Sequence, residues 1–131
     1  MITKEQVQGL FEHTRDLLRD GEIDWDIDGV CLWSYFFVDL SKERLQQAAE
    51  HLERQGYQVM GILEPEPEDD DQETLRLQVD KVEKHSVNSL MSRNIEFYAL
   101  ARKLQLRDYD GMECGAVDLD EPGDPSDSGC P

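Results

Sequence analysis

The chain has 131 residues, 38% of them hydrophobic, which is enough for one folded domain with a buried core. It carries 13 Lys and Arg against 30 Asp and Glu, so its formal net charge at pH 7 is −17. A charge of this sign repels phosphate backbones. It therefore argues against direct nucleic-acid binding and favours a partner with a basic, arginine-rich protein segment.

The N-terminal segment is predicted to be a helix. Thr3 and Gln6 have the spacing of a capping box, and apolar residues follow at helical intervals as far as Gly21. This start lacks the apolar stretch of a signal peptide, and no later run approaches the roughly 18 apolar residues of a membrane span. The cysteines form neither a metal-site spacing nor a disulfide framework, which agrees with a cytoplasmic location: Cys31, Cys114 and Cys130.

Residues 24–29, DWDIDG, begin in the way that a helix–loop–helix calcium site begins. Such a loop needs a glutamate at its twelfth position, and counting from Asp24 that position is Tyr35. The ligand that would close the site is therefore missing. We expect an acidic turn in which the aspartates stay solvated and Gly29 allows an unusual backbone angle.

Residues 30–39, VCLWSYFFVD, are predicted to form a strand because they are rich in aromatic and β-branched side chains. Both faces are apolar, with Trp33, Tyr35 and Phe37 on one of them, so we expect a central strand covered on both sides. Aromatic side chains on an open sheet are also typical of RNA-stacking domains. The segment 74–83 lacks the basic, glycine and aromatic pattern of such domains, so we interpret these aromatics as core beneath the first helix.

Capping residues predict the remaining helices, and the alternation of apolar and polar side chains predicts the remaining strands. Ser41 is expected to cap a helix ending at Gly56, and Ser86 to cap another. Strands are predicted at 57–63 and 74–83, with a short last strand at 112–117. A helix followed by β-α-β-β-α-β is typical of an α+β, ferredoxin-like antiparallel sheet with an extra N-terminal helix. We expect the helices on one face and the extra helix over part of the other.

Two acidic stretches hold most of the excess charge. Residues 64–73 carry seven acids and no base, and residues 118–131 carry five acids and no base. The first is interpreted as a solvated loop, and the second as a disordered acidic tail after a domain of residues 1–117. Solvated charge needs no partner, but if a basic segment docks, these are the candidate partner-binding residues: Glu64, Glu66, Glu68, Asp69, Asp70, Asp71, Glu73, Asp118, Asp120 and Glu121.

No catalytic, cofactor or metal site is predicted. General acid–base chemistry needs a group whose pKa is shifted by its surroundings, and nothing in the sequence indicates such a residue. His13, His51 and His85 are expected at or near helix surfaces without a matched nucleophile, and Cys31 is expected to be a small core residue. We therefore expect a protein that is not an enzyme.

The segment 85–115 carries the most specific pattern. Within a Ser-led helix and the turn expected after it stand three short motifs: Arg93-Asn94, Leu100-Ala101 and Tyr109-Asp110-Gly111. In their order and spacing the chain resembles the family of regulators of ribonuclease E activity B, the RraB family, over residues 3–117. One departure is Met112, which stands where the family usually has Trp.

The resemblance implies a cytoplasmic protein with a ferredoxin-like fold that binds ribonuclease E and inhibits it. The family contacts the enzyme's non-catalytic scaffold region, and the arginine-rich character of such regions agrees with the charge of this chain. Two other hypotheses stay open. One is an immunity or inhibitor-type protein that acts against a basic nuclease or toxin, and the other is a calcium- or carboxylate-dependent enzyme.

The residues of the last motifs also have structural interpretations. Asn94 falls on the apolar stripe of its helix, so we expect its side chain to make a buried hydrogen bond. We expect the ring of Tyr109 to pack against the same helix, and Gly111 to supply a positive φ in the turn.

Overall fold

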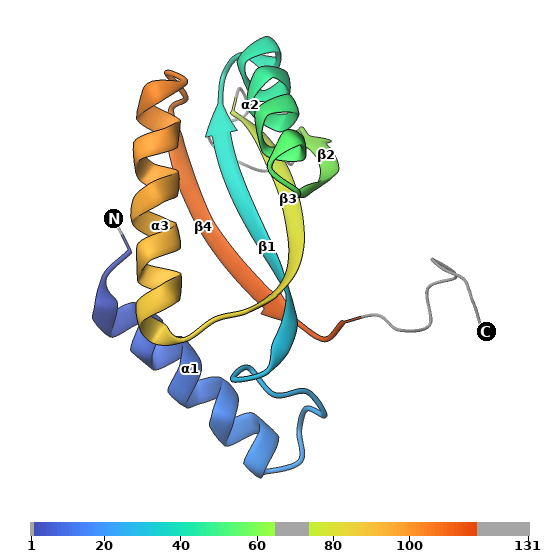
Figure 1. Cartoon of the computed structure of the whole chain (residues 1–131), viewed down its shortest axis with the longest axis vertical. Coiled ribbons are helices and arrows are strands. Elements are labelled where there is room, and N and C mark those ends of the chain that lie inside the picture. Colours follow the sequence, from blue (N-terminus) through green and yellow to red (C-terminus); the bar gives the residue numbers. More distant parts are fainter. Residues whose placement is uncertain (1, 65–73, 118–131) are drawn as a thin grey trace, which may run out of the picture.

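The computed structural model describes residues 2–64 and 74–117 (Figure 1). The predicted acidic tail at 118–131, and 65–73 of the predicted acidic loop, lie outside the described residues. The elements follow in the predicted order: α1 (Lys4–Arg19), β1 (Val30–Asp39), α2 (Lys42–Arg54), β2 (Gln58–Leu63), β3 (Leu75–Lys84), α3 (Val87–Lys103) and β4 (Asp108–Gly115).

The strands form one four-stranded sheet in the order β2-β3-β1-β4, in which every neighbouring pair is antiparallel. β1 is an interior strand with the predicted limits, whereas β4 begins at Asp108 rather than at Met112. It begins earlier because Asp108 and Tyr109 already pair with Val38 and Phe37, beyond a β-bulge.

The helices begin at the predicted caps. Thr3 Oγ1 accepts the Gln6 N–H at 3.1 Å and Gln6 Oε1 accepts the Thr3 N–H at 2.8 Å, which completes the capping box of α1. Ser41 and Ser86 cap α2 and α3. Gly56, just after α2, has a φ of 99°, a backbone angle that favours glycine at the end of a helix.

The three helices lie on the side of the sheet to which the β1 aromatics point (Figure 1). Trp33 stacks on Phe11 of α1 with ring centroids 6.2 Å apart, and Tyr35 and Phe37 meet Phe97 of α3 at 5.0 and 5.1 Å. These three aromatics of β1 are fully buried, so they are core and are not available to stack on RNA bases. The expectation that they lie beneath the first helix holds for Trp33, whereas the other two lie beneath α3.

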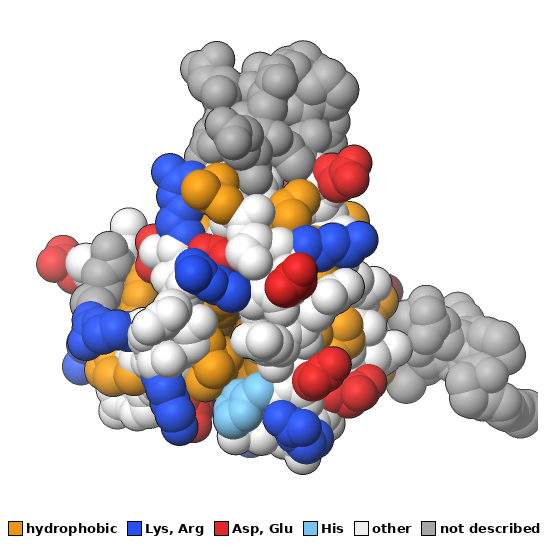
Figure 2. All heavy atoms as spheres, turned by 90° about the horizontal axis from the view of Figure 1, so that it is seen from above, with side chains coloured by type: hydrophobic (Ala, Val, Ile, Leu, Met, Phe, Trp, Pro, Cys, Tyr) orange, Lys and Arg blue, Asp and Glu red, His pale blue; other side chains and the backbone are white. Residues whose placement is uncertain are grey.

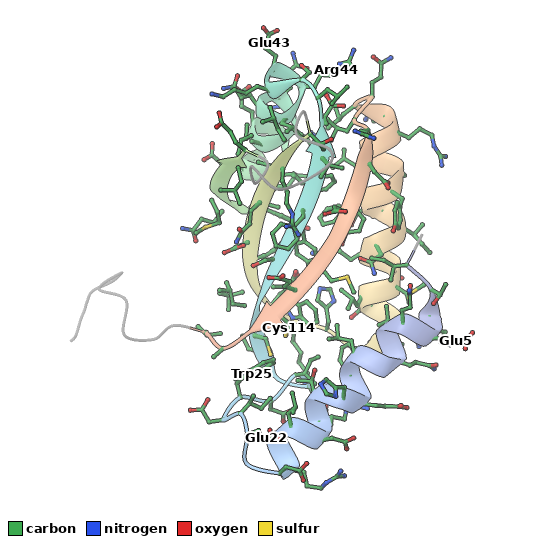
Figure 3. The ribbon with its side chains drawn as sticks, turned by 180° about the vertical axis from the view of Figure 1, so that it is seen from behind. Glu5, Glu22, Trp25, Glu43, Arg44 and Cys114 are labelled. Carbon is green, nitrogen blue, oxygen red and sulfur yellow. The ribbon has the colours of Figure 1, made fainter. Side chains whose placement is uncertain are left out.

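The opposite face of the sheet carries no helix in the described part of the chain (Figure 3). Val30 is 63% exposed there, and Leu32 and Val38 are half-buried. The prediction that α1 covers the second face is wrong. The prediction that β1 is covered on both sides holds for Phe36, which is 5% exposed on this face, but not for Val30, over which the described residues place no helix. α1 instead extends the helical layer, because its buried Phe11 packs on Trp33.

Candidate functional site

A buried polar cluster joins α3 to the sheet. Tyr35 comes from β1, Glu83 from the end of β3, His85 from the link that follows, and Arg93 from the middle of α3. Alternation along β3 places Glu83 on the same side as the core residues Leu77 and Val79, beneath α3. We call the cluster of Tyr35, Glu83, His85 and Arg93 the Arg93 clamp.

The ion pair at the centre of the Arg93 clamp has two-pronged geometry. Arg93 Nη1 and Nη2 donate to Glu83 Oε2 and Oε1 at 2.8 and 3.0 Å, and the Tyr35 hydroxyl donates to Glu83 Oε2 at 2.5 Å. The side chains of Arg93 and Glu83 are only 18% and 13% exposed. The guanidinium carbon also lies 5.5 Å from the ring centroid of Tyr57 and 5.8 Å from that of Phe97. Charge-assisted bonds of this kind are among the stronger ones in proteins.

His85 completes the cluster and corrects a prediction. Its ring is 5% exposed rather than at a helix surface. Nε2 lies 2.9 Å from the Tyr35 hydroxyl and 3.2 Å from Glu83 Oε2, while Nδ1 lies 2.9 Å from Ser89 Oγ. The ring also packs edge-on to Trp33, with centroids 5.1 Å apart. The prediction was wrong because His85 precedes α3 and its side chain turns in beneath the first turn of the helix.

The charge states of Glu83 and Tyr35 in the Arg93 clamp are fixed at neutral pH. Burial alone raises the pKa of Glu83, but the hydrogen bonds from His85, Arg93 and Tyr35 outweigh it and lower that pKa to about 2. Burial, reinforced by the Glu83 carboxylate, raises the pKa of Tyr35 well above its usual range. A general acid or base works best when its pKa lies near the working pH, so neither group is suited to proton transfer.

A second buried contact involves the sequence motifs. The Tyr109 hydroxyl donates to Asn94 Oδ1 at 2.7 Å, and both residues are 1% exposed. The ring of Tyr109 lies 5.3 Å from that of Phe97 and 5.1 Å from that of Tyr98, centroid to centroid, on α3. Both predictions, a buried hydrogen bond for Asn94 and helix packing for Tyr109, are confirmed. The sequence did not indicate that the two residues pair with each other.

The Tyr109-Asp110-Gly111 motif is not a turn before the last strand. It lies within β4, where Phe37 pairs with Tyr109 and Phe36 with Gly111, so that Asp110 is the extra residue of a bulge. Gly111 has the predicted positive φ, at 119°. Aspartate and glycine are typical of both turns and bulges, which explains the wrong interpretation.

A shallow depression of about 590 Å³ adjoins the Arg93 clamp. Its wall mixes acidic, basic and hydroxyl side chains: Glu83, Lys84, His85, Ser89, Ser92, Arg93 and Glu96. Glu83 already accepts bonds on both oxygens from within the protein. Over residues 2–64 and 74–117, no group of His, Cys, Asp and Glu side chains is arranged to hold a metal ion.

Two of the three aspartates of DWDIDG, Asp26 and Asp28, make hydrogen bonds within the protein. Arg15 of α1 donates to both oxygens of Asp28, at 2.8 and 2.7 Å, and this hydrogen bond helps to hold the pKa of that carboxyl below its usual range. Asp26 Oδ1 accepts the Asp28 N–H at 2.9 Å, and its carbonyl accepts the Gly29 N–H at 2.9 Å. Gly29 lacks the predicted unusual angle, because these bonds close the turn without a positive φ.

Of the ten acidic residues predicted to bind a partner, Glu64 is the one that the structure describes, and it is exposed directly after β2. The other nine lie outside the described residues, so their role stays a prediction. Cys31 is 1% exposed, as predicted for a small core residue, and its Sγ donates to the Asp26 carbonyl at 3.0 Å.

The fold and the clamp define a small α+β protein in which buried charged side chains fix a helix to one face of an antiparallel sheet. The sequence model of the family described as RraB, regulator of ribonuclease activity B, matches residues 12–114. This range is more than half of the chain and includes the whole Arg93 clamp. The chain therefore belongs to the RraB family, a family of regulators of ribonuclease activity, and the resemblance seen in the sequence is confirmed.

Comparison with curated proteins gave no significant match. Among the helices of the described residues, none is long and apolar enough to cross a bilayer.

Proposed function

We propose that this protein regulates a ribonuclease by binding a basic segment of it, and that it catalyses no reaction itself. The family match over residues 12–114 carries the proposal, because the family consists of regulators of ribonuclease activity. The net charge of −17 supports a basic partner.

The Arg93 clamp supports an action without catalysis. Glu83 stays ionised and Tyr35 stays protonated at neutral pH, so both hold α3 in place rather than exchange protons. A helix fixed in this way presents a preformed surface, and a preformed surface loses less conformational entropy on binding.

The finer features of the proposal come from the RraB resemblance. It implies ribonuclease E as the partner, the enzyme's arginine-rich scaffold region as the bound segment, inhibition as the effect, and the cytoplasm as the place of action. It also implies a ferredoxin-like fold, which the strand order β2-β3-β1-β4 supports. Guanidinium groups pair with carboxylates through two parallel hydrogen bonds, which suits an acidic protein to such a segment.

The two acidic stretches are the proposed electrostatic contacts. Removing the 11 acids of 65–73 and 118–131 from the total of −17 leaves −6 on the described residues. On the face seen in Figure 2, acidic and basic side chains are interspersed with apolar ones. Exposed ion pairs contribute less than about 1 kcal/mol each and are screened by salt, so binding needs many of them together with an apolar anchor.

Calorimetric titration of the full chain with an arginine-rich scaffold segment of ribonuclease E tests this proposal. We expect binding at low salt that weakens at about 0.15 M salt, because screening reduces the attraction between exposed charges. A variant that ends at Val117 keeps every described element and is expected to bind more weakly.

A scaffold segment whose arginines are replaced by glutamine is the matched control, and we expect it not to bind. Failure of the native segment to bind at low salt contradicts the ribonuclease E proposal. Tight binding to an unrelated basic nuclease or toxin would instead favour the immunity-type alternative.

A further inference from the structure

We propose that the open face of the sheet, opposite the helices, docks a basic amphipathic segment of the partner protein. This inference rests on the proposed function for the basic character of the segment, and it adds the surface that binds it. The surface consists of the outward side chains of β1 and β3 together with the acidic side chains of β4 (Figure 3).

The first observation is the apolar stripe on this face. Val30, Leu32, Phe36 and Val38 follow one another on the outer side of β1, and the register places Val82 of β3 directly beside Leu32. Val30 and Val82 are 63% and 51% exposed. A strand with one face in water ordinarily alternates apolar and polar residues, whereas β1 has the two-sided apolar sequence of a covered strand. Phe36 is 5% exposed and Leu32 and Val38 are half-buried, so the exposed part of the stripe is centred on Val30 and Val82. Exposed apolar side chains that lie side by side are typical of interaction sites.

The second observation is a row of acids beside the stripe. Asp108 and Glu113 of β4 pair with Val38 and Ser34, so they share the outer face with the apolar stripe of β1. Asp110, at the bulge, reaches the same face, because its carboxylate lies 3.5 Å from Arg76 Nε. All three acids are exposed. The inward residues of this strand are Tyr109, Met112 and Cys114, so β4 directs its acids to the open face.

Arg76 shows how a basic side chain sits on this surface. It rises from β3, its guanidinium carbon lies 4.0 Å from the ring centroid of Phe36, and it contacts Asp110 at the far side of β1. The chain's own arginine thus combines stacking on the stripe with an ion pair to β4. A partner arginine further along the sheet would pack its aliphatic stem on the exposed valines of the stripe and pair its guanidinium with Glu113.

The acidic side chains of β4 indicate which kind of segment binds the open face. A second copy of the chain would bring another net charge of −17 to this face, and the chain's own residues 118–131 carry five acids and no base. Both would face the acids of β4, and like charges repel. A segment with apolar residues on one side and arginine or lysine on its flank complements both the stripe and the acidic row.

The test uses variants of the full chain in two matched pairs. The double variant Val30→Lys/Val82→Lys places positive charge in the stripe, and its control Ile95→Lys changes a residue of α3 that is also exposed, at 60%. Glu113→Lys reverses one charge of the acidic row, and Glu53→Lys makes the same change on the exposed side of α2. Circular dichroism checks that each variant is folded.

Two probes separate this inference from the proposed function. One is the ribonuclease E scaffold segment, and the other is a synthetic amphipathic peptide with leucine along one side and arginine along the other. We expect the open-face variants to weaken the binding of any probe that the native chain binds by at least about tenfold, and the controls to change it by less than about twofold.

The outcomes distinguish the two claims. If the native chain binds the scaffold segment and the open-face variants bind it equally well, the docking surface is wrong and the proposed function stands. If the native chain binds only the synthetic peptide, through the open face, the surface stands and ribonuclease E is the wrong partner. Binding of neither probe overturns both claims.

Two further results would assign the face to another occupant and overturn the inference. One is a native dimer that Val30→Lys/Val82→Lys dissociates, which would make the face a self-interface. The other is stronger peptide binding at the open face after truncation at Val117, which would make the C-terminal stretch its natural occupant.

Discussion

Glu83 illustrates how one side chain holds the helical layer in place. Replacing it by glutamine leaves the Arg93 guanidinium 18% exposed and without its two-pronged partner. Removing one member of a buried ion pair is costly, so we expect Glu83→Gln to lower the free energy of unfolding by about 3 kcal/mol. Urea denaturation measures this as a lower midpoint with an unchanged slope.

The matched control is Glu96→Gln. Glu96 also contacts Arg93, with its Oε1 at 3.4 Å from Nε, but its side chain is 67% exposed. We expect a loss below about 1 kcal/mol for this variant. Equal losses for the two variants would contradict the central role of Glu83 in the clamp.

The same carboxyl predicts how stability depends on pH. The pKa of Glu83 is lowered from 4.5 to about 2 in the folded protein. Its contribution is therefore fully present above the unfolded pKa, and it is lost as the pH falls through 4.5 toward 2. The two pKa values correspond to about 3 kcal/mol. We expect the stability difference between native protein and Glu83→Gln to shrink at about pH 3, and a constant difference would be incompatible with an ionised Glu83.

The Asn94–Tyr109 pair makes a prediction about a neutral hydrogen bond. Tyr109→Phe removes the hydroxyl that donates to Asn94 Oδ1 and leaves that oxygen buried. An unsatisfied buried acceptor lowers the free energy of unfolding by about 1–3 kcal/mol. The double variant Asn94→Leu/Tyr109→Phe, measured by thermal unfolding, should lose less than the sum of the single variants. Additive losses would show that the two side chains do not interact.

At the scale of elements, the bulge in β4 depends on Gly111. Its φ of 119° is unfavourable for other residues, and an added Cβ would find its nearest contact at 3.9 Å, on Ile2. The penalty for Gly111→Ala therefore comes from the backbone angle rather than from a clash, and we expect it to be about 1–2 kcal/mol. Gly115→Ala in the same strand is the control, because that glycine has no positive φ and no neighbour within 4 Å of an added Cβ. Thermal unfolding compares the two, and similar losses would argue against the strain.

The elements themselves were largely predictable from the sequence. The caps Thr3, Ser41 and Ser86 fixed the helix starts because each signal lies within a few residues of the chain. β1 was predicted with its observed limits from its aromatic and β-branched content. The start of β4 was missed because residues that form turns also form bulges, and only the pairing with β1 distinguishes the two.

The site was predictable only in part. Alternation along β3 indicates that Glu83 points the same way as Leu77 and Val79, which is a signal that an inward acid needs a partner. Its partner Arg93 lies ten residues further along the chain, on α3. The contact between them depends on how α3 packs on the sheet, which the local sequence does not show. Likewise, periodicity shows that both faces of β1 are apolar, but it does not show how many layers cover them.

At the scale of the whole molecule, the proposed binding depends on both the charge and the fold. The described part of the chain carries −6 of the −17, and residues 65–73 and 118–131 carry the other −11. In the complex we propose with a basic partner, the long-range attraction comes mostly from those residues, and salt screens it. The open face of the sheet is the proposed apolar anchor that such attraction needs for specific binding.

The most direct measurement is an RNA-cleavage assay with two forms of ribonuclease E, one complete and one without its scaffold region. A regulator that acts by binding the scaffold slows cleavage by the complete enzyme, more strongly at low salt, and leaves the shortened enzyme unchanged. Equal inhibition of both forms would place the action at the catalytic region and contradict binding through the scaffold. Unchanged cleavage by both forms would contradict regulation of this enzyme altogether.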